Sequence, residues 1–136
     1  MSAIIVLCGC IGNKTALNAG NEQLKLQSSV VEFQDSSFNI STKLVKDTYT
    51  DETYEIVDSI EVKYLFKNIA GRPIHIEATA EFYDKNDKLV GIGGPTSIYL
   101  PKDYTEKSYT LQNSIIYDGS NVADVKYALL IVEEKV

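Results

Sequence analysis

Two cysteines and one histidine are the side chains of this 136-residue chain with the most distinctive chemistry. Cys8 and Cys10 are separated by one residue, and a Cys-x-Cys pair can bind a metal or take part in redox reactions. Structural zinc takes four ligands, however, and no further cysteine or histidine lies near the pair. Residues 11–136 contain no cysteine, so the stability of that part must come from an apolar core.

The residues around Cys10 indicate a different chemistry. Leu7, Cys8 and Gly9 precede it at the end of a short apolar stretch, and a polar segment follows. This arrangement resembles the lipobox of bacterial and archaeal lipoproteins, and Ile11-Gly12-Asn13 is similar to the tether of an archaeal surface lipoprotein. The resemblance implies cleavage before Cys10, lipid on its sulfur, and a chain held to the cell membrane on the extracytoplasmic face.

A second interpretation of the N-terminus stays open. In this alternative the protein is cytosolic, Ile4–Leu7 is its first buried strand, and both thiols are free and reduced. Mass spectrometry of the natively expressed protein separates the two interpretations, because an intact Met1 or an unmodified Cys10 indicates the cytosolic form.

Residues that could carry catalysis are scarce. His75 is the only histidine, and it stands on the polar side of an alternating segment between Ile74 and Ile76, with no nucleophile motif to accompany it. The sequence has no G-x-S-x-G or H-E-x-x-H motif. Gly91-Ile92-Gly93-Gly94 lacks the helix and lysine of a nucleotide-binding loop. We therefore predict no enzymatic activity and no cofactor.

Two acidic segments offer the oxygen ligands that calcium prefers. One contains Asp84, Asn86 and Asp87, and the other is the segment 47–52 with two aspartates and a glutamate. Neither has the twelve-residue calcium-loop pattern with its distal glutamate, and Asp and Asn are common in solvated turns. We predict ordinary turns and no metal site.

Tyrosines are the best candidates for binding. The chain has nine, and Tyr49 and Tyr54 lie in a polar segment, residues 47–55, without an aliphatic side chain. An exposed tyrosine combines an apolar ring with a hydroxyl, which suits recognition of proteins or sugars. Tyr49, Tyr54 and Tyr104 therefore form the candidate interaction surface for a protein or glycan partner in the cell envelope. A solvated hairpin whose tyrosines pack locally is the simpler alternative.

Charge and length limit the classes of function. The net charge is 13 − 19 = −6, and Arg72 is the only arginine, so the chain lacks the basic field that nucleic-acid binding needs. Beyond the N-terminus the longest apolar stretch is Tyr127–Val132, far short of the roughly 20 residues that span a bilayer. We predict no nucleic-acid partner and attachment to the membrane through lipid alone.

From Leu24 onward the hydrophobic pattern has a period of two, as in strands with one buried face. Together with the polar turns between them, the alternating segments predict seven strands in an immunoglobulin-like β-sandwich. The expected strands are Ser29–Phe33, Ser37–Lys46, Tyr54–Asn68, Ile74–Tyr83, Lys88–Tyr99, Thr105–Gln112 and Val125–Glu133.

Two details of this all-β prediction can be checked separately. The last strand is apolar at almost every position, so we expect it in the interior of its sheet. Three glycines and a proline in residues 91–95 predict a bulge or bend that interrupts pairing. The domain plan has a signal peptide at residues 1–9, a lipid-anchored tether at 10–27 and the sandwich at 28–136.

Residues 61–132 resemble the FxLYD-type domain, an immunoglobulin-like module of secreted and surface-anchored prokaryotic proteins. The resemblance is carried by the segments 62–68, 71–74 and 80–84, and by the loop Pro101-Lys102-Asp103. In the characteristic motif, Ala80 and Phe82 stand where the family has Phe and Leu, and Tyr83-Asp84 match. The family carries no general catalytic residues, so the resemblance implies a fold and a location and gives Tyr83 and Asp84 structural roles.

Two functions remain after these exclusions. The first is a non-enzymatic, lipid-anchored module that binds or spaces something in the cell envelope. The second is an extracytoplasmic carrier of a small ligand or ion. A carrier needs an enclosed pocket with converging polar groups, whereas an interaction module shows a flat or convex patch and a filled interior.

Overall fold

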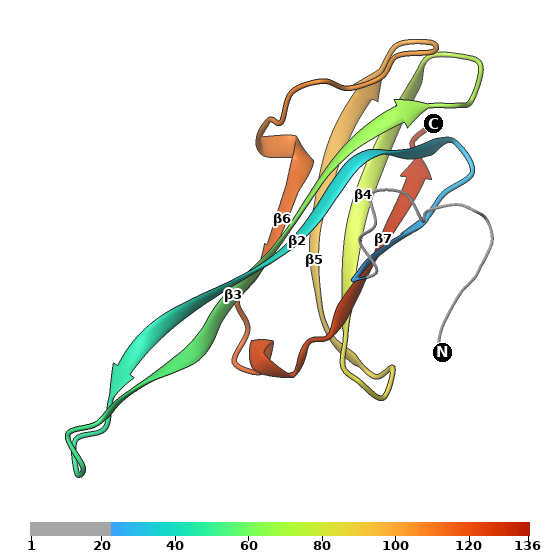
Figure 1. Cartoon of the computed structure of the whole chain (residues 1–136). Coiled ribbons are helices and arrows are strands. Elements are labelled where there is room, and N and C mark those ends of the chain that lie inside the picture. The colour runs from blue at the N-terminus through green and yellow to red at the C-terminus, as the bar shows by residue number, and fades with distance from the viewer. Residues whose placement is uncertain (1–22) are drawn as a thin grey trace.

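The computed structural model describes residues 23–136, which form two stacked antiparallel-rich sheets and no α-helix (Figure 1). The predicted signal peptide, the lipidation site Cys10 and most of the predicted tether lie outside these residues. The elements are β1 (Leu24–Gln27), β2 (Val31–Lys46), β3 (Thr53–Asn68), β4 (Ile74–Tyr83), β5 (Leu89–Leu100), the 3₁₀ turn η2 (Leu111–Asn113), β6 (Ser114–Tyr117), the 3₁₀ turn η3 (Val122–Asp124) and β7 (Tyr127–Glu134). The prediction of an all-β sandwich is confirmed.

The strand order explains the immunoglobulin-like character. One sheet has the order β1-β7-β4-β5 and the other β2-β3-β6. In the immunoglobulin nomenclature, strands β2, β3 and β6 correspond to A, B and E. In the other sheet, β5, β4 and β7 correspond to C′, C and F. The place of strand G beside F is taken by β1, which comes from the other end of the chain and therefore runs parallel to β7.

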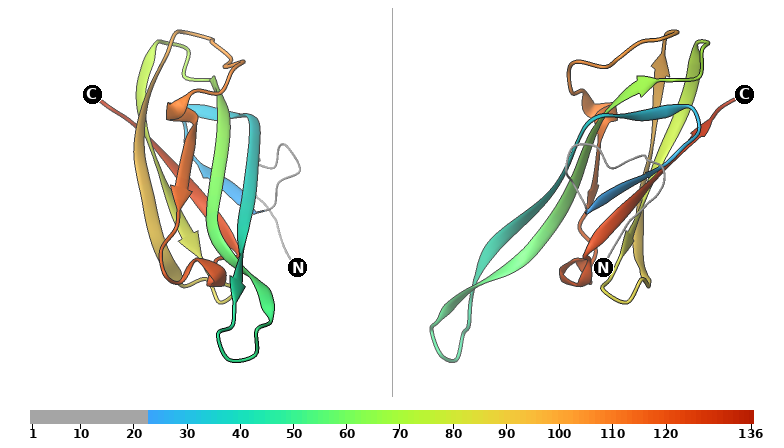
Figure 2. Two further views of the ribbon diagram at one scale, coloured as in Figure 1. Left: turned by 90° about the vertical axis from the view of Figure 1, so that its left-hand side faces the viewer. Right: turned by 45° about the vertical axis from the view of Figure 1, so that its right-hand side comes forward.

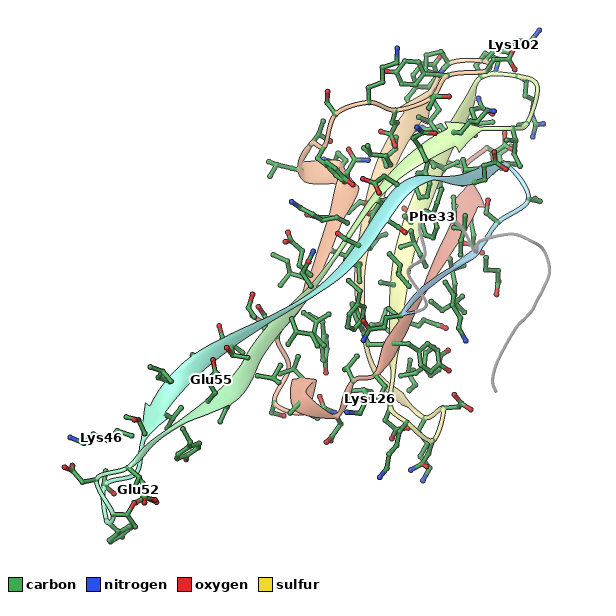
Figure 3. All side chains as sticks on the ribbon, viewed as in Figure 1. Phe33, Lys46, Glu52, Glu55, Lys102 and Lys126 are labelled. Atoms are coloured by element: carbon green, nitrogen blue, oxygen red, sulfur yellow. The ribbon has the colours of Figure 1, made fainter. Side chains whose placement is uncertain are left out.

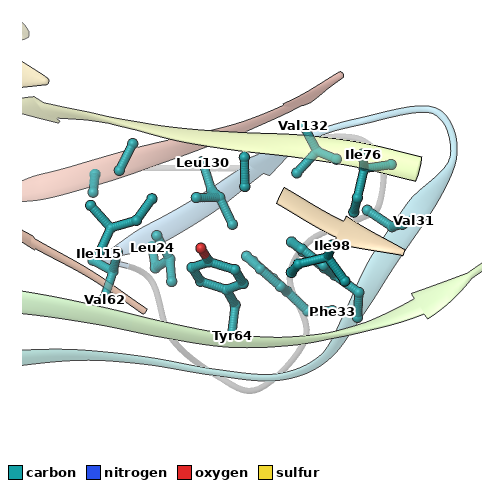
Figure 4. Close-up of a cluster of buried hydrophobic side chains, with 14 of the residues drawn as sticks. Leu24, Val31, Phe33, Val62, Tyr64, Ile76, Ile98, Ile115, Leu130 and Val132 are labelled. Carbon is teal, nitrogen blue, oxygen red and sulfur yellow. The ribbon is translucent and has the colours of Figure 1, made fainter. Parts of the chain in front are cut away.

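The core lies between the two sheets and is built from the inward half of each alternating pattern (Figure 4). Tyr64 and Phe66 from β3 pack with their ring centroids 5.1 Å apart, and Phe82 from β4 is also fully buried. The Tyr64 hydroxyl is bonded to Thr96 Oγ1 at 2.7 Å, so the polar atom of this buried ring has a partner. Aromatic and branched side chains thus fill the space between the sheets.

Three predicted strands differ from the structure. The expected strands Ser29–Phe33 and Ser37–Lys46 are one continuous strand, β2, because a bulge at Gln34 shifts the register without ending the pairing. Thr105–Gln112 is not a strand. It is a loop followed by η2, and its one β-bridge pairs Thr105 with Lys67. The strand β6 comes only after that loop.

The sheet also begins earlier than predicted. Leu24 is 1% exposed and pairs with Ala128, so β1 belongs to the sandwich although Leu24–Gln27 lies inside the segment assigned to the tether. The last strand, β7, lies between β1 and β4, which confirms that it is interior.

The glycine-rich segment is a bulge inside a strand that continues. β5 changes register against β4 between Thr96 and Gly93, as predicted, yet its pairing resumes on both sides. Gly91 and Gly93 are needed because β6 approaches closely there. A Cβ on Gly93 would lie 2.6 Å from Ile115 Cγ2, and one on Gly91 would lie 2.3 Å from the Tyr117 ring.

Candidate functional site

The most prominent surface feature is a long hairpin that leaves the sandwich. β3 pairs with β6 only as far as Ile60, which lies opposite Tyr117, whereas β2 and β3 stay paired with each other out to Lys46 and Thr53. We call residues 41–58, beyond the last β6 partner, the arm. It projects past the sandwich as a twisted two-stranded ribbon (Figure 2). Six residues of strand on each side give it a length of about 20 Å.

The local sequence accounts for the arm. Thr42, Val45, Ile56 and Val57 are β-branched and favour extended backbone. A second bulge, at Asp58, lies where the arm meets the body, between the Ser41–Ser59 and Thr42–Val57 pairs. Bulges bend and twist a ribbon, which explains why the arm turns away from the sheet to which it is joined.

Both faces of the arm carry apolar side chains. Directly opposite residues share a face of a sheet, so Leu44 lies with Glu55, and Val45 lies with Tyr54. Leu44 is 72% exposed and Tyr54 is 51% exposed. Apart from Val57 at its base, which packs against the core, the arm has no second layer of protein over either face within residues 23–136.

A hydrogen-bonded turn closes the arm. Asp47 Oδ1 accepts from the backbone nitrogens of Tyr49 at 2.7 Å and Thr50 at 3.2 Å, and Asp51 adopts a positive φ of 64°. The Asp47 backbone nitrogen donates to Glu52 O and the Asp51 backbone nitrogen to Asp47 O, which completes the loop. The result is a fixed turn from which Tyr49 projects with 96% of its surface exposed.

The arm is acidic. It contains two lysines and five carboxylates, which gives 2 − 5 = −3. Lys43 pairs with Asp58 at 3.5 Å and Lys46 with Asp51 at 2.8 Å. The other three carboxylates, Asp47, Glu52 and Glu55, have no cationic partner within the described part of the chain, and Glu55 accepts a bond from Thr42. An exposed apolar ribbon with surplus negative charge is suited to bind a basic partner.

The three predicted binding tyrosines do not form one surface. Tyr49 and Tyr54 are together at the tip of the arm. Tyr104 lies at the far end of β3, where its carbonyl accepts from the Asn68 backbone nitrogen at 2.8 Å. Figure 3 shows this separation, with Lys46 and Glu52 at one extreme of the molecule and Lys102 at the other. The 16 residues of β3 span the distance between them.

A buried polar network near Tyr104 was not found from the sequence. The side-chain nitrogen of Asn113 donates to Tyr64 O at 2.9 Å and to both carboxylate oxygens of Glu106 at 3.1 Å. Glu106 Oε1 also accepts from the Phe66 backbone nitrogen at 2.8 Å. Asn68 Nδ2 donates to the carbonyls of Arg72, Leu100 and Pro101. Hydrogen bonds of these three side chains, Asn68, Glu106 and Asn113, satisfy backbone groups that a neighbouring strand would otherwise satisfy.

Burial, together with bonds to carboxylates in two cases, raises the pKa values of three tyrosines. Loss of solvent and the bond to Asp35 raise the pKa of Tyr109 to about 12. Burial and the bond to Asp87, 2.8 Å away, raise the pKa of Tyr127 above its usual range. Burial raises the pKa of Tyr64 to about 12, against the bond to Thr96, which lowers it. All three hydroxyls are neutral and structural at ordinary pH.

The other candidate residues, His75 and those of the two acidic segments, lie on the surface and in turns. His75 is exposed on β4, beside Tyr99 of β5. Asp84 Oδ1 accepts from the backbone nitrogens of Asn86 and Lys88, and the bond from Lys88 is the main reason that the pKa of Asp84 is lowered. Among residues 23–136 no three side chains of the metal-binding types gather into a site. The two acidic segments are therefore hydrogen-bonded turns in the structure.

No protein-family model, no curated protein and no solved structure matches this chain. In the part of the chain that the structure describes, no helix has the length and apolar character needed to cross a bilayer. The structure itself defines the class: a seven-stranded β-sandwich that carries a protruding β-hairpin arm. The lipobox and FxLYD resemblances stay predictions.

Proposed function

We propose that this protein is a non-enzymatic, lipid-anchored module of the cell envelope whose arm binds a protein partner. The observation that carries the proposal is the exposure of Leu44, Tyr49 and Tyr54 on a ribbon that stands clear of the body. A tyrosine on a convex protrusion can enter a pocket of a partner and be desolvated there, as binding hot spots are. Isolated two-stranded ribbons are marginally stable in water, so a partner also stabilises the arm.

The charge of the arm defines the chemistry of that partner. Asp47, Glu52 and Glu55 lie around the exposed apolar side chains, and none of the three forms an ion pair with a lysine or arginine of residues 23–136. A protein surface that presents lysine or arginine around an apolar pocket complements this pattern. The body of the domain is itself acidic, which makes a second copy of the chain a poor partner.

The position of the predicted anchor supports a partner close to the membrane. The chain enters the sandwich at Leu24, which pairs with Ala128 near the start of β7. Residues 11–23 can reach at most about 45 Å when extended, and the arm is about 20 Å long. A lipid on Cys10 would therefore leave the arm enough room to contact a partner near the membrane surface.

The filled interior supports a binding module over a ligand carrier. Tyr64, Phe66 and Phe82 occupy the space between the sheets, and each is fully buried. A carrier needs that space for its cargo. The exposed apolar side chains of the arm lie instead on a convex feature, as expected of an interaction module.

Site-specific photo-crosslinking in the native host tests the binding role of the arm. A photoreactive phenylalanine analogue is placed at Tyr49, at Leu44, and, as the matched control, at Leu111, which is 90% exposed at the other end of the molecule. We expect the same protein to be crosslinked from both arm positions and not from position 111. The double variant Glu52→Lys/Glu55→Lys should reduce the yield at least about tenfold.

Equal crosslinking from all three positions, or none from the arm, would overturn the proposed role. If the two charge reversals leave the crosslinking yield unchanged, the arm still binds the partner, but the proposal that the partner surface is basic is wrong. Far-ultraviolet circular dichroism and the melting temperature of each variant establish that the sandwich is still folded.

The anchor is tested separately. In the native host, Cys10→Ser should release the protein from the membrane fraction, whereas Cys8→Ser should leave it attached, because only Cys10 is predicted to carry lipid. Mass spectrometry should show loss of residues 1–9 and an added lipid mass. An intact Met1 with an unmodified Cys10 would contradict anchoring and leave the arm without a membrane location.

A further inference from the structure

A groove lies at the end of the sandwich opposite the arm. It has a volume of about 380 Å³ and separates the last residues of β5 from the segment 104–112. Sites for small ligands usually have volumes of about 300 to 1,000 Å³. The groove is open to solvent, so a bound ligand would remain partly exposed.

Two tyrosines border the groove. Tyr99 comes from the end of β5 and is 63% exposed, and Tyr104 comes from the facing loop and is 44% exposed. Neither hydroxyl has a hydrogen-bond partner among residues 23–136. The rings therefore offer apolar faces and free hydroxyls at the same place, which suits ligands that are apolar on one face and polar at the edge.

The rest of the lining is mostly neutral and polar. Ser97, Ser108 and Gln112 contribute hydroxyl and amide groups, each of which can both donate and accept a hydrogen bond. The two charged residues of the lining, Glu106 and Lys107, have opposite signs, so the groove has no net charge. This combination favours neither an anion nor a cation.

The groove is formed before any ligand arrives. Asn68 Nδ2 fixes the carbonyls of Leu100 and Pro101 on one side, at 3.2 and 2.9 Å. On the other side, Glu106 is bonded to the Phe66 backbone nitrogen, and Thr110 and Asn113 cap η2 through reciprocal hydrogen bonds. A rigid site loses little conformational entropy on binding, which favours even a small ligand.

We propose that this groove binds a short neutral oligosaccharide. Sugar rings present C–H groups on their faces and hydroxyls at their edges, and those hydroxyls both donate and accept. Tyr99 and Tyr104 stack against the ring faces, while Ser97, Ser108 and Gln112 bond the hydroxyls. The site is separate from the arm, so the inference does not depend on the protein partner proposed above.

Amide chemical shifts of the full-length ¹⁵N-labelled protein test the inference. The probes are chitotriose, cellotriose, maltotriose and mannotriose, each titrated alone. We expect at least one to shift amides of residues 97–112 and to leave those of residues 41–58 unchanged. Tyr99→Ala and Tyr104→Ala should each lower the affinity for that probe at least about tenfold. Tyr99→Phe should keep most of the affinity, because it retains the stacking ring.

Tyr49→Ala is the matched control, since it removes an exposed tyrosine from the arm and should leave the titration unchanged. Absence of shifts in residues 97–112 with all four probes would overturn the inference, as would equal affinity of the parent and the two alanine variants. Tighter binding of a neutral tripeptide or of trigalacturonate than of every neutral sugar would also overturn it, by assigning the groove to a peptide or an anion. Unchanged core resonances verify that each variant is folded.

Discussion

The two ends of this sandwich reverse the usual relation between regular structure and rigidity. The arm is a regular antiparallel ribbon, yet beyond Val57, which packs against the core, both of its faces are open to water. The opposite end, residues 101–113, is almost free of regular structure, yet Asn68, Glu106 and Asn113 are buried there and bond it to β3 and β5. Rigidity thus follows burial and hydrogen-bond satisfaction more closely than strand content.

The comparison also separates two kinds of binding surface. An exposed ribbon can adapt its twist to a macromolecular partner, and its long reach suits a partner that is itself large. A loop fixed by a buried network holds a small concave site in one shape. The proposed functions of the two ends, protein binding by the arm and sugar binding by the groove, follow this division.

The largest effect should come from Asn113→Ala. The side chain is 1% exposed, and its removal leaves the Tyr64 carbonyl and the Glu106 carboxylate with fewer donors in a buried place. We expect a loss of about 3 kcal/mol in the free energy of unfolding, measured by urea denaturation. Asn39→Ala, on an exposed part of β2, should change it by less than about 0.5 kcal/mol. Similar losses for the two variants would contradict a special role for the network.

Native-state hydrogen exchange compares the two ends directly. The backbone amides of Phe66 and Glu106 are bonded to Glu106 Oε1 and Phe66 O and lie beside the core, so they should exchange only on global unfolding. Amides of residues 41–58 should exchange by local opening, at least about 100-fold faster. Equal protection at both ends would show that the arm is as rigid as the body and would remove the contrast.

Alkaline pH should destabilise the folded core through the buried hydroxyl of Tyr64, which bonds Thr96. The pKa of Tyr64 is raised from 10.0 to about 12 by burial, so the folded state retains the proton more strongly than the unfolded chain. The contribution of this hydroxyl to the free energy of unfolding is complete below pH 10. About 2 kcal/mol of that free energy is lost as the pH rises from 10 to 12. Tyr64→Phe should flatten the stability profile in that window. Tyr109 acts in the same direction, because its pKa is also raised to about 12, so some slope should remain in the variant.

The smallest effect should follow removal of the arm. Joining Ser41 to Ser59 by Asn-Gly keeps a directly opposed pair and supplies a favoured two-residue turn. Most of the deleted side chains are exposed, and half-buried Val57 is the main one that packs against the core, so the free energy of unfolding should change by about 1 kcal/mol. The purified deletion variant should no longer retain the partner that crosslinking identified, while the sugar titration stays intact. A collapse of the fold would show that the arm is part of the core.

Alternation alone located most of the fold. Ile74–Tyr83 was predicted to the residue and β7 within two residues, because both have one face packed against the other sheet over their whole length. The prediction failed where backbone groups are satisfied by something other than a regular partner. Residues 105–112 alternate too, but Glu106 and Asn113 take the hydrogen bonds that a neighbouring strand would supply.

The candidate site was only partly accessible from the sequence. A polar segment with Tyr49 and Tyr54 indicated an exposed hairpin tip, and both tyrosines are indeed exposed at the tip of the arm. The sequence does not show that β2 and β3 continue past the end of β6, because that depends on where a third strand ends. For the same reason Tyr104 was grouped with residues that lie at the other end of the 16-residue β3.

The sequence by itself determined the sheet class, the absence of disulfides from residues 11–136, the acidic charge and the faces of the long strands, since these depend on composition and on a period of two along the chain. The tertiary structure decided which strands are neighbours. It placed β1 beside β7 in the position of a missing last strand and left the arm without a second layer. It also brought Asn68, Glu106 and Asn113 together. Such contacts join residues distant in sequence, and a local pattern contains no record of them.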